Sequence, residues 1–172
     1  MKHVNLLYRL VKVILIAGIL FVPAWLYAAP RSGQAAPNFK LSTTSGQQVS
    51  LEGYRGSVLV LDFFATWCQP CRISIPHLVE MNNKYGKQGL QVLGMSADED
   101  GEKAVKAFAN QYRITYPIAL AGESTQVDFG VRSVPVMFVI DKKGRVAEVF
   151  RGFTDEVARS SEQLIKKLLA EK

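Results

Sequence analysis

Two long apolar runs restrict the folds that this chain can adopt. Residues 58–65 (VLVLDFFA) are almost continuously apolar and rich in branched and aromatic side chains, and residues 90–97 (LQVLGMSA) are similar. Such runs are typical of strands that are buried on both faces of a sheet. A sheet of this kind needs a covering layer on each side, so the runs predict an α/β protein.

Helical and extended patterns alternate along the rest of the domain. Residues 38–51 predict two short extended pieces around a Ser-Gly turn, and residues 142–144 (KKG) predict a hairpin turn between two further strands. Helices are expected over residues 69–84, 98–113 and 124–129, a short strand over residues 116–120, and a last helix after Thr154. This order predicts a mixed central sheet covered on both faces.

The first 30 residues have the pattern of an export signal. Lys2, Arg9 and Lys12 precede an uncharged stretch that runs from residue 13 to residue 30. As a helix this stretch would span about 27 Å, close to the thickness of a bilayer core. Residues 1–30 are therefore expected to be a cleaved signal peptide or a retained signal-anchor helix, followed by a linker over residues 31–36. Both alternatives place the domain of residues 37–172 outside the cytoplasm.

The domain itself carries little net charge. The whole chain has a formal charge of +6, but Lys2, Arg9, Lys12 and Arg31 contribute four of these charges, which leaves +2 for the domain. The domain sequence contains no basic cluster and no nucleic-acid-binding motif. We therefore expect no nucleic-acid partner.

Cys68 and Cys71 are the only two cysteines, and they form a CxxC motif for which three interpretations compete. A closed zinc site needs about four ligands, but only His77 lies near the pair in sequence, so we assign no metal site. A purely structural disulfide would close a very short loop and remove little entropy from the unfolded chain. The third interpretation is a redox-active pair.

The position of the pair favours redox chemistry. It follows a predicted buried strand and begins a predicted helix, so Cys68 should lie beside unpaired N–H groups and the positive end of the helix dipole. Both stabilise a thiolate and lower the pKa of the thiol. Cys68 is then the nucleophile that attacks a partner disulfide, and Cys71, one turn further and more buried, resolves the mixed disulfide. Pro70 fits the first turn, where no N–H is needed.

The segment WCQPC after VLVLDFFAT resembles the thioredoxin-like superfamily, and with the export segment the chain is similar to the TlpA/ResA-like thiol–disulfide oxidoreductases. The match covers residues 36–169 and includes APNFKL at its start, Pro76 in the active-site helix and GVRSVPVMFVIDKKGRV over residues 130–146. It implies a thioredoxin-like three-layer sandwich with an N-terminal extension. It also implies a central strand–helix insert between residues 97 and 116.

The resemblance implies that a group of residues around the cysteines binds the substrate. Pro135 falls where the superfamily has a cis-proline facing the CxxC motif, so that the backbone at Val134 can bind a partner peptide as a strand would. A trans proline on an edge strand is the alternative. Trp67, Gln69 and Pro70 would also contact the substrate, and core packing is the alternative for Trp67.

Asp62 and Ser74 are the two positions that bear on proton transfer to and from the cysteines. Asp62 lies six residues before Cys68, where thioredoxins have a buried acid, and burial would let it accept or return the proton of Cys71. A strand-end carboxylate satisfied by a neighbour is the alternative. Ser74 departs from the family, since many ResA-like proteins have glutamate there. A serine does not titrate in the working range, so Asp62 would supply the acid–base function. The alternative for Ser74 is that it faces solvent and has no role at the site.

These observations predict an extracytoplasmic thiol–disulfide oxidoreductase of the protein-disulfide reductase type. The resemblance implies a monomer in the bacterial periplasm or at the outer face of the inner membrane, attached to that membrane if residues 1–30 are retained. A membrane electron donor of the thiol-reducing type would keep it reduced, and its substrates would be disulfides in exported proteins, apocytochrome c among them. No cofactor is needed, because the Cys68–Cys71 disulfide carries the electrons. Two alternatives stay open: a thiol peroxidase of the peroxiredoxin type, which usually has Thr where this chain has Ala65, and a non-catalytic polypeptide-binding assembly factor.

Overall fold

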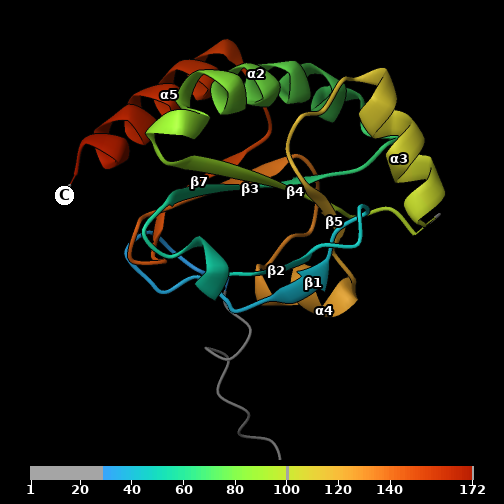
Figure 1. Ribbon diagram of the computed structural model, residues 1–172, viewed down its shortest axis with the longest axis horizontal. Helices are drawn as coiled ribbons and strands as arrows, with labels where there is room; N and C mark the ends of the chain where they lie inside the picture. The colour runs from blue at the N-terminus through green and yellow to red at the C-terminus, as the bar shows by residue number, and fades with distance from the viewer. Residues whose placement is uncertain (1–28, 100, 172) are drawn as a thin grey trace, which may run out of the picture.

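A mixed five-stranded sheet with the strand order β5-β4-β3-β6-β7 forms the centre of the computed structural model, which describes residues 29–99 and 101–171 (Figure 1). The strands are β3 (Val58–Phe64), β4 (Leu90–Ser96), β5 (Ile118–Leu120), β6 (Val136–Ile140) and β7 (Val146–Arg151). β3 is parallel to β4 and β4 to β5, while β6 is antiparallel to both β3 and β7. Every residue of β3 is buried, so the first apolar run is the central strand.

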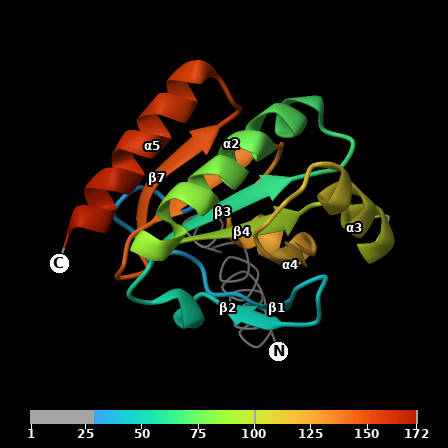
Figure 2. The ribbon, with the colours of Figure 1, turned by 45° about the horizontal axis from the view of Figure 1, so that its top comes forward.

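Helices and a hairpin cover the two faces of this sheet. α2 (Gln69–Tyr85) and α5 (Asp155–Ala170) lie side by side on one face, with α3 (Glu102–Gln111) at the β5 end (Figure 1, Figure 2). α4 (Glu123–Asp128) and the antiparallel hairpin of β1 (Lys40–Ser42) and β2 (Gln48–Ser50) lie on the other face. The described residues also form the 3-10 helices η2 (Glu52–Tyr54) and η3 (Gly86–Gln88). The predicted three-layer architecture is confirmed. Between β4 and β5 the described residues form the helix of the expected insert, α3, but no additional strand, so that part of the prediction is wrong.

The two faces of β3 build two parts of the core, because side chains alternate along a strand. Phe63 points toward the hairpin and α4, where its ring lies 5.3 Å from that of Phe129. Val60 points toward α2 and packs in a cluster with Leu78. Each fully buried side chain of this size contributes about 1.5–3 kcal/mol to folding. Asp62 has the same orientation as Val60, so its carboxylate lies on the α2 side of the core.

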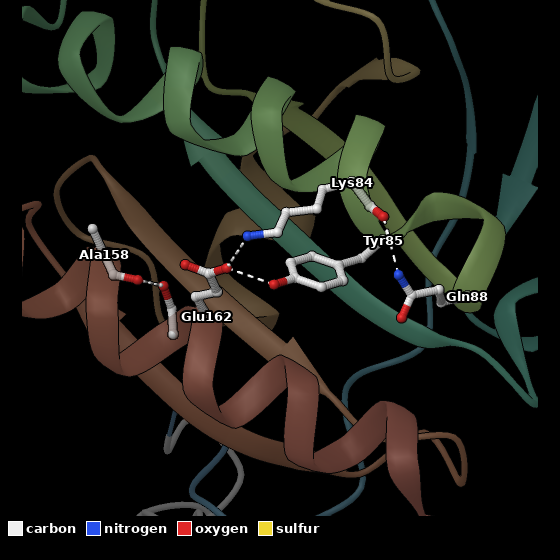
Figure 3. A network of polar contacts seen from close by, with 6 residues as sticks. Lys84, Tyr85, Gln88, Ala158 and Glu162 are labelled. Carbon is white, nitrogen blue, oxygen red and sulfur yellow. Dashed lines mark hydrogen bonds and ion pairs between the residues drawn. The ribbon is translucent and has the colours of Figure 1, made fainter.

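A network of polar contacts joins α2 to α5 (Figure 3). Lys84 Nζ and Tyr85 Oη, both from α2, donate to Glu162 Oε1 of α5 at 2.8 and 2.5 Å. The hydrogen bond with Glu162 raises the pKa of Lys84 above its usual range, and the hydrogen bond from Lys84 lowers the pKa of Glu162. The same carboxylate therefore holds two neighbouring residues of the helix that begins at the cysteines.

α5 begins where the sequence predicts. Thr154 is its N-cap, and the hydroxyl oxygen of Thr154 accepts the N–H of Val157 at 3.2 Å. Asp155 and Glu156 occupy the first turn, where negative charge interacts favourably with the helix dipole. The cap and these acids together define the start of the helix that flanks α2.

Residues 31–36, expected as a linker, are attached to the sheet. The N–H of Gly33 donates to the C=O of Val146 at 2.8 Å, the N–H of Val146 to the C=O of Gln34 at 2.9 Å, and the N–H of Ala36 to the C=O of Gly144 at 3.0 Å. The segment therefore runs along the start of β7. Residues 1–28 of the expected signal peptide or anchor helix lie outside the described residues. None of the helices in the described part has the length and apolar character needed to span a membrane.

Candidate redox site

The two cysteines lie where the chain passes from β3 to α2. Cys68 is the N-cap of α2, and its Sγ accepts the N–H of Cys71 at 3.2 Å. The two sulfur atoms form a disulfide, with the Cα atoms 5.3 Å apart. Cys68 is 4% exposed, whereas Cys71 is completely buried. Cys71 is therefore the more buried of the two, as the sequence predicts.

The side chains that flank Cys68 in sequence are exposed. Trp67 is 67% exposed, so the alternative that it packs in the core is wrong. Gln69 and Pro70 are exposed as well, on the first turn of α2. Sequence reasoning missed Ile73, which is 63% exposed. A partner that approaches Cys68 would meet Trp67 and this first turn of the helix.

The predicted proline segment lies beside the cysteines. The Val134–Pro135 peptide bond is cis, so the trans alternative is wrong. Val134 packs against the cluster of buried residues that contains both cysteines. Pro135 is buried, and its C=O accepts the N–H of Gly152 at 2.9 Å. The fold thus brings residues 134 and 135 to the redox pair from more than 60 positions away in sequence.

Asp62 is buried below α2. It is 1% exposed and lies in β3 on the same face as Val60 and Phe64, whose side chains contact α2 residues in the core clusters. Its Oδ2 has no hydrogen-bond partner among the described residues, so a neighbour does not fully satisfy the carboxylate. Burial raises the pKa of Asp62 to about 7. The group can therefore gain or lose a proton near neutral pH.

Gly94 and Tyr116, which sequence reasoning missed, complete the surroundings of Asp62. Gly94 is the β4 residue in register with Asp62. A Cβ atom on Gly94 would come within 3.1 Å of Ile118 and Phe64 and within 3.4 Å of the Tyr116 ring. Burial, and then the charge of Asp62, raises the pKa of Tyr116, whose hydroxyl has no partner among the described residues. The missing side chain at position 94 thus makes room for a buried phenol near Asp62.

Ser74 lies on the buried face of α2 together with Cys71. Its hydroxyl donates to the C=O of Cys71 at 3.0 Å. The alternative that Ser74 faces solvent is therefore wrong. A side chain at this position is close enough to the pair to influence it.

Sequence reasoning also missed the contacts of Thr66. Its N–H and hydroxyl donate to the carboxylate of Asp98, and its C=O accepts from the guanidinium of Arg72. A signal for Asp98 did exist, because it follows β4, and the ends of two adjacent parallel strands meet at the same edge of a sheet. The connection between β3 and Cys68 is thus held from two neighbouring elements.

Comparisons with known proteins agree with this geometry. The profile of the AhpC/TSA family matches residues 32–149. The chain is 32% identical over 174 residues to the thiol-disulfide oxidoreductase ResA of Bacillus thuringiensis (strain Al Hakam), an alignment that covers 98% of this chain and 99% of that protein. It is 35% identical over 123 residues to the thioredoxin-like protein YneN of Bacillus subtilis (strain 168), covering 71% of this chain and 72% of that one. A crystal structure from Chlorobium tepidum, assigned as the thiol:disulfide interchange protein DsbE, is similar with a TM-score of 0.77 and 33% identity, over 83% of this chain and 100% of that chain.

Proposed function

This chain belongs to the AhpC/TSA family and, within it, to the ResA-like thiol–disulfide oxidoreductases, and we propose that it reduces disulfide bonds in exported proteins, apocytochrome c among them. The observation that carries the proposal is the Cys68–Cys71 disulfide at the start of α2, with Val134 packed against the same cluster and Asp62 buried in β3 on the face that α2 covers. Such a dithiol can pass two electrons to a partner disulfide with no further redox group.

In the reduced protein, Cys68 starts the exchange as a thiolate. Its Sγ attacks one sulfur of the partner disulfide, a mixed disulfide forms, and the second partner sulfur leaves as a thiolate. The N–H groups at the start of α2, including that of Cys71, stabilise the negative charge on Cys68. Trp67 offers the partner an exposed apolar surface, and the backbone at Val134 can bind its chain as a neighbouring strand would.

Cys71 completes the exchange, with Asp62 as its proton acceptor. The thiol of Cys71 passes its proton to the carboxylate of Asp62, and the resulting thiolate attacks Sγ of Cys68. The mixed disulfide breaks, the partner leaves as a thiolate, and the Cys68–Cys71 disulfide forms again. Two electrons have then passed to the partner. A pKa of about 7 suits Asp62 to accept a proton and return it at neutral pH.

A second dithiol must return two electrons to the oxidised pair. We assign this role to a membrane electron donor of the thiol-reducing type, because the export pattern of residues 1–30 would place the domain in the periplasm or at the outer face of the inner membrane. The cysteines, Asp62 and Val134 all belong to one chain, so a monomer suffices for the cycle. No cofactor takes part.

Insulin reduction tests the proposal. The pre-reduced wild type should reduce the insulin disulfides rapidly, and Cys68→Ser should be inactive. Cys71→Ser should accumulate a mixed disulfide with its partner, since attack proceeds without resolution. Trapping by Cys68→Ser, with Cys71 intact, would reverse the assigned order of the two cysteines.

Two further measurements separate the alternative functions. A peroxidase would consume hydrogen peroxide faster than it reduces insulin, and a polypeptide-binding assembly factor would bind unfolded partners equally well as wild type and as Cys68→Ser without reducing them. Either result would overturn the reductase proposal. The reduction potential of the pair gives the direction of electron flow, since a value of about −270 mV favours a reductant and one of about −120 mV an oxidant.

A further inference from the structure

Thr66 is held by all three of its polar groups, although it lies in the short connection between β3 and Cys68. Its N–H donates to both carboxylate oxygens of Asp98 at 3.0 Å, and its Oγ1 donates to Asp98 Oδ1 at 2.6 Å. Its C=O accepts from Nη2 of Arg72 at 2.9 Å and from Nε at 3.3 Å. Asp98 from the end of β4 and Arg72 from α2 thus fix this residue from two sides.

Asp98 is itself held firmly. It is buried, its Oδ2 accepts the hydroxyl of Ser96 at 2.7 Å, and its N–H donates to Ser96 Oγ at 3.2 Å. Ser96 is completely buried, and it is the last residue of β4, in register with Phe64 of β3. Hydrogen bonds to an ionised carboxylate are about twice as strong as those between neutral groups. Asp98 therefore connects Thr66 to a rigid part of the sheet.

We propose that Asp98 is a positioning residue for the redox pair, which holds Cys68 at the N-cap of α2 through its hydrogen bonds to Thr66. The inference rests on the proposed role of Cys68 as the nucleophile. Only Trp67 lies between Thr66 and Cys68, so movement of Thr66 would be passed on to the cysteine. If Thr66 were released, Sγ of Cys68 would lose its fixed place beside the N–H of Cys71, which stabilises the thiolate.

A direct effect of the Asp98 charge on the pKa of the Cys68 thiol would have the opposite sign to the effect of lost positioning. A nearby carboxylate disfavours a thiolate, so neutralising Asp98 would lower the pKa of the Cys68 thiol if charge dominated. Loss of positioning would raise that pKa. Other charged or titratable groups on the elements around the pair include Asp62 on β3, Arg72, His77 and Glu80 on α2, Lys106 on α3 and Arg132 ahead of Pro135. All of them stay unchanged when position 98 is substituted.

Alkylation of Cys68 by iodoacetamide, measured against pH on the reduced protein, separates the two effects. Asp98→Ala removes every acceptor for Thr66 and should slow alkylation at pH 7 about three- to tenfold, a difference that disappears above about pH 9, where the thiol is ionised in both proteins. Asp98→Asn keeps an acceptor oxygen for Thr66 and should stay within about twofold of wild type. A positioning role thus predicts different results for two variants that lose the same charge.

Substitutions at Thr66 repeat the comparison with the carboxylate in place. Thr66→Val keeps the shape but loses the hydroxyl and should slow alkylation, whereas Thr66→Ser keeps the hydroxyl and should behave as wild type. Thermal unfolding shows whether Asp98→Ala folds. If it does not fold, the two Thr66 variants still test whether the hydrogen bonds to Asp98 position Cys68.

Two results would overturn the inference. Faster alkylation in both Asp98 variants would mean that the charge dominates, and superimposable profiles for all variants would remove Asp98 from the redox site. Failure of the proposed function has a different signature, because wild type itself would then not reduce insulin. If wild type reduces insulin but Asp98→Ala and Thr66→Val are alkylated at the wild-type rate, only the positioning role is refuted.

Discussion

Asp62 is a buried acid on the face of β3 that the cysteine-bearing helix covers. Burial raises its pKa to about 7, whereas an aspartate in an unfolded chain has a pKa of about 3.9. Between these two values the native state binds a proton that the unfolded state does not. The stability that neutral Asp62 preserves is therefore lost as the pH rises through this window.

Asp62→Asn should raise the free energy of unfolding at and above neutral pH. The difference between the two pKa values corresponds to about 4 kcal/mol at most, reached when Asp62 is fully ionised in the folded protein. Wild type should lose stability between about pH 4 and pH 7, and the variant should not show this loss. Urea unfolding of both proteins from pH 4 to pH 8 measures the difference, and parallel curves would contradict the raised pKa. The variant should also slow the resolving step of Cys71 more than the first attack by Cys68.

Ser74→Glu should lower both stability and reactivity. Ser74 is buried against the C=O of Cys71, so a carboxylate at this position would lose water without gaining a cation. We expect a loss of about 2 kcal/mol or more, together with slower alkylation at neutral pH because a negative charge raises the pKa of a thiol. Ser74→Ala removes only the hydroxyl and is the control, with a change within about 1 kcal/mol. If Ser74→Glu melted as wild type does, position 74 would tolerate a carboxylate that escapes to solvent.

At the scale of elements, one carboxylate joins α2 to α5. Glu162 accepts hydrogen bonds from Lys84 and Tyr85, and these lower its pKa. An acid with a lowered pKa stabilises the fold above its unfolded pKa, and the contribution is lost as the pH falls through the folded value. The contact between the two helices should therefore weaken in acid.

Tyr85→Phe should lower the free energy of unfolding by about 1 kcal/mol at neutral pH, because it removes the hydroxyl that binds Glu162. The loss should shrink below about pH 4, where Glu162 becomes protonated. Tyr112→Phe is the matched control, since the hydroxyl of Tyr112 has no hydrogen bond to the residues that the structure describes. Thermal unfolding at pH 7 and pH 3 measures both variants. If Tyr85→Phe lost the same stability at both pH values, its effect would come from packing alone.

Local patterns predict the elements, because each pattern depends on neighbouring residues. The apolar run of residues 58–65 forms β3, and Thr154 caps α5, as predicted. The cysteine pair, Asp62 and Pro135 could be placed because a family motif accompanies them. The bond between Thr66 and Asp98 joins residues 32 positions apart, and that between Tyr85 and Glu162 joins residues 77 apart. Neither is a property of a short segment, because only the strand order and the packing of helices bring such residues together.

At the scale of the whole molecule, one N-terminal segment reaches both outer strands of the sheet. Its first part pairs with residues 144–146 at the start of β7. Further along, the N–H of Thr44 donates to the C=O of Ile118 at 2.8 Å, and Thr43 forms a bridge with Ala119 of β5. The segment is therefore part of the folded domain.

Ala36→Pro should destabilise the domain. The substitution removes the N–H that donates to the C=O of Gly144, with an expected loss of about 1 kcal/mol or more. Ala35→Pro is the matched control, because no hydrogen bond of the Ala35 N–H occurs within residues 29–99 and 101–171. Urea unfolding compares the two variants, and equal losses would show that the hydrogen bond from the Ala36 N–H does not stabilise the domain.

The covered parts of the outer strands also protect the domain against aggregation. An exposed sheet edge has free N–H and C=O groups, and a foreign chain can add there as an extra strand and start an aggregate. β5 has only three residues and is bridged by Thr43, and the start of β7 is occupied by residues 33–36. A foreign extended chain therefore finds no template at these places. Strand addition, one route by which folded domains begin to aggregate, is blocked there.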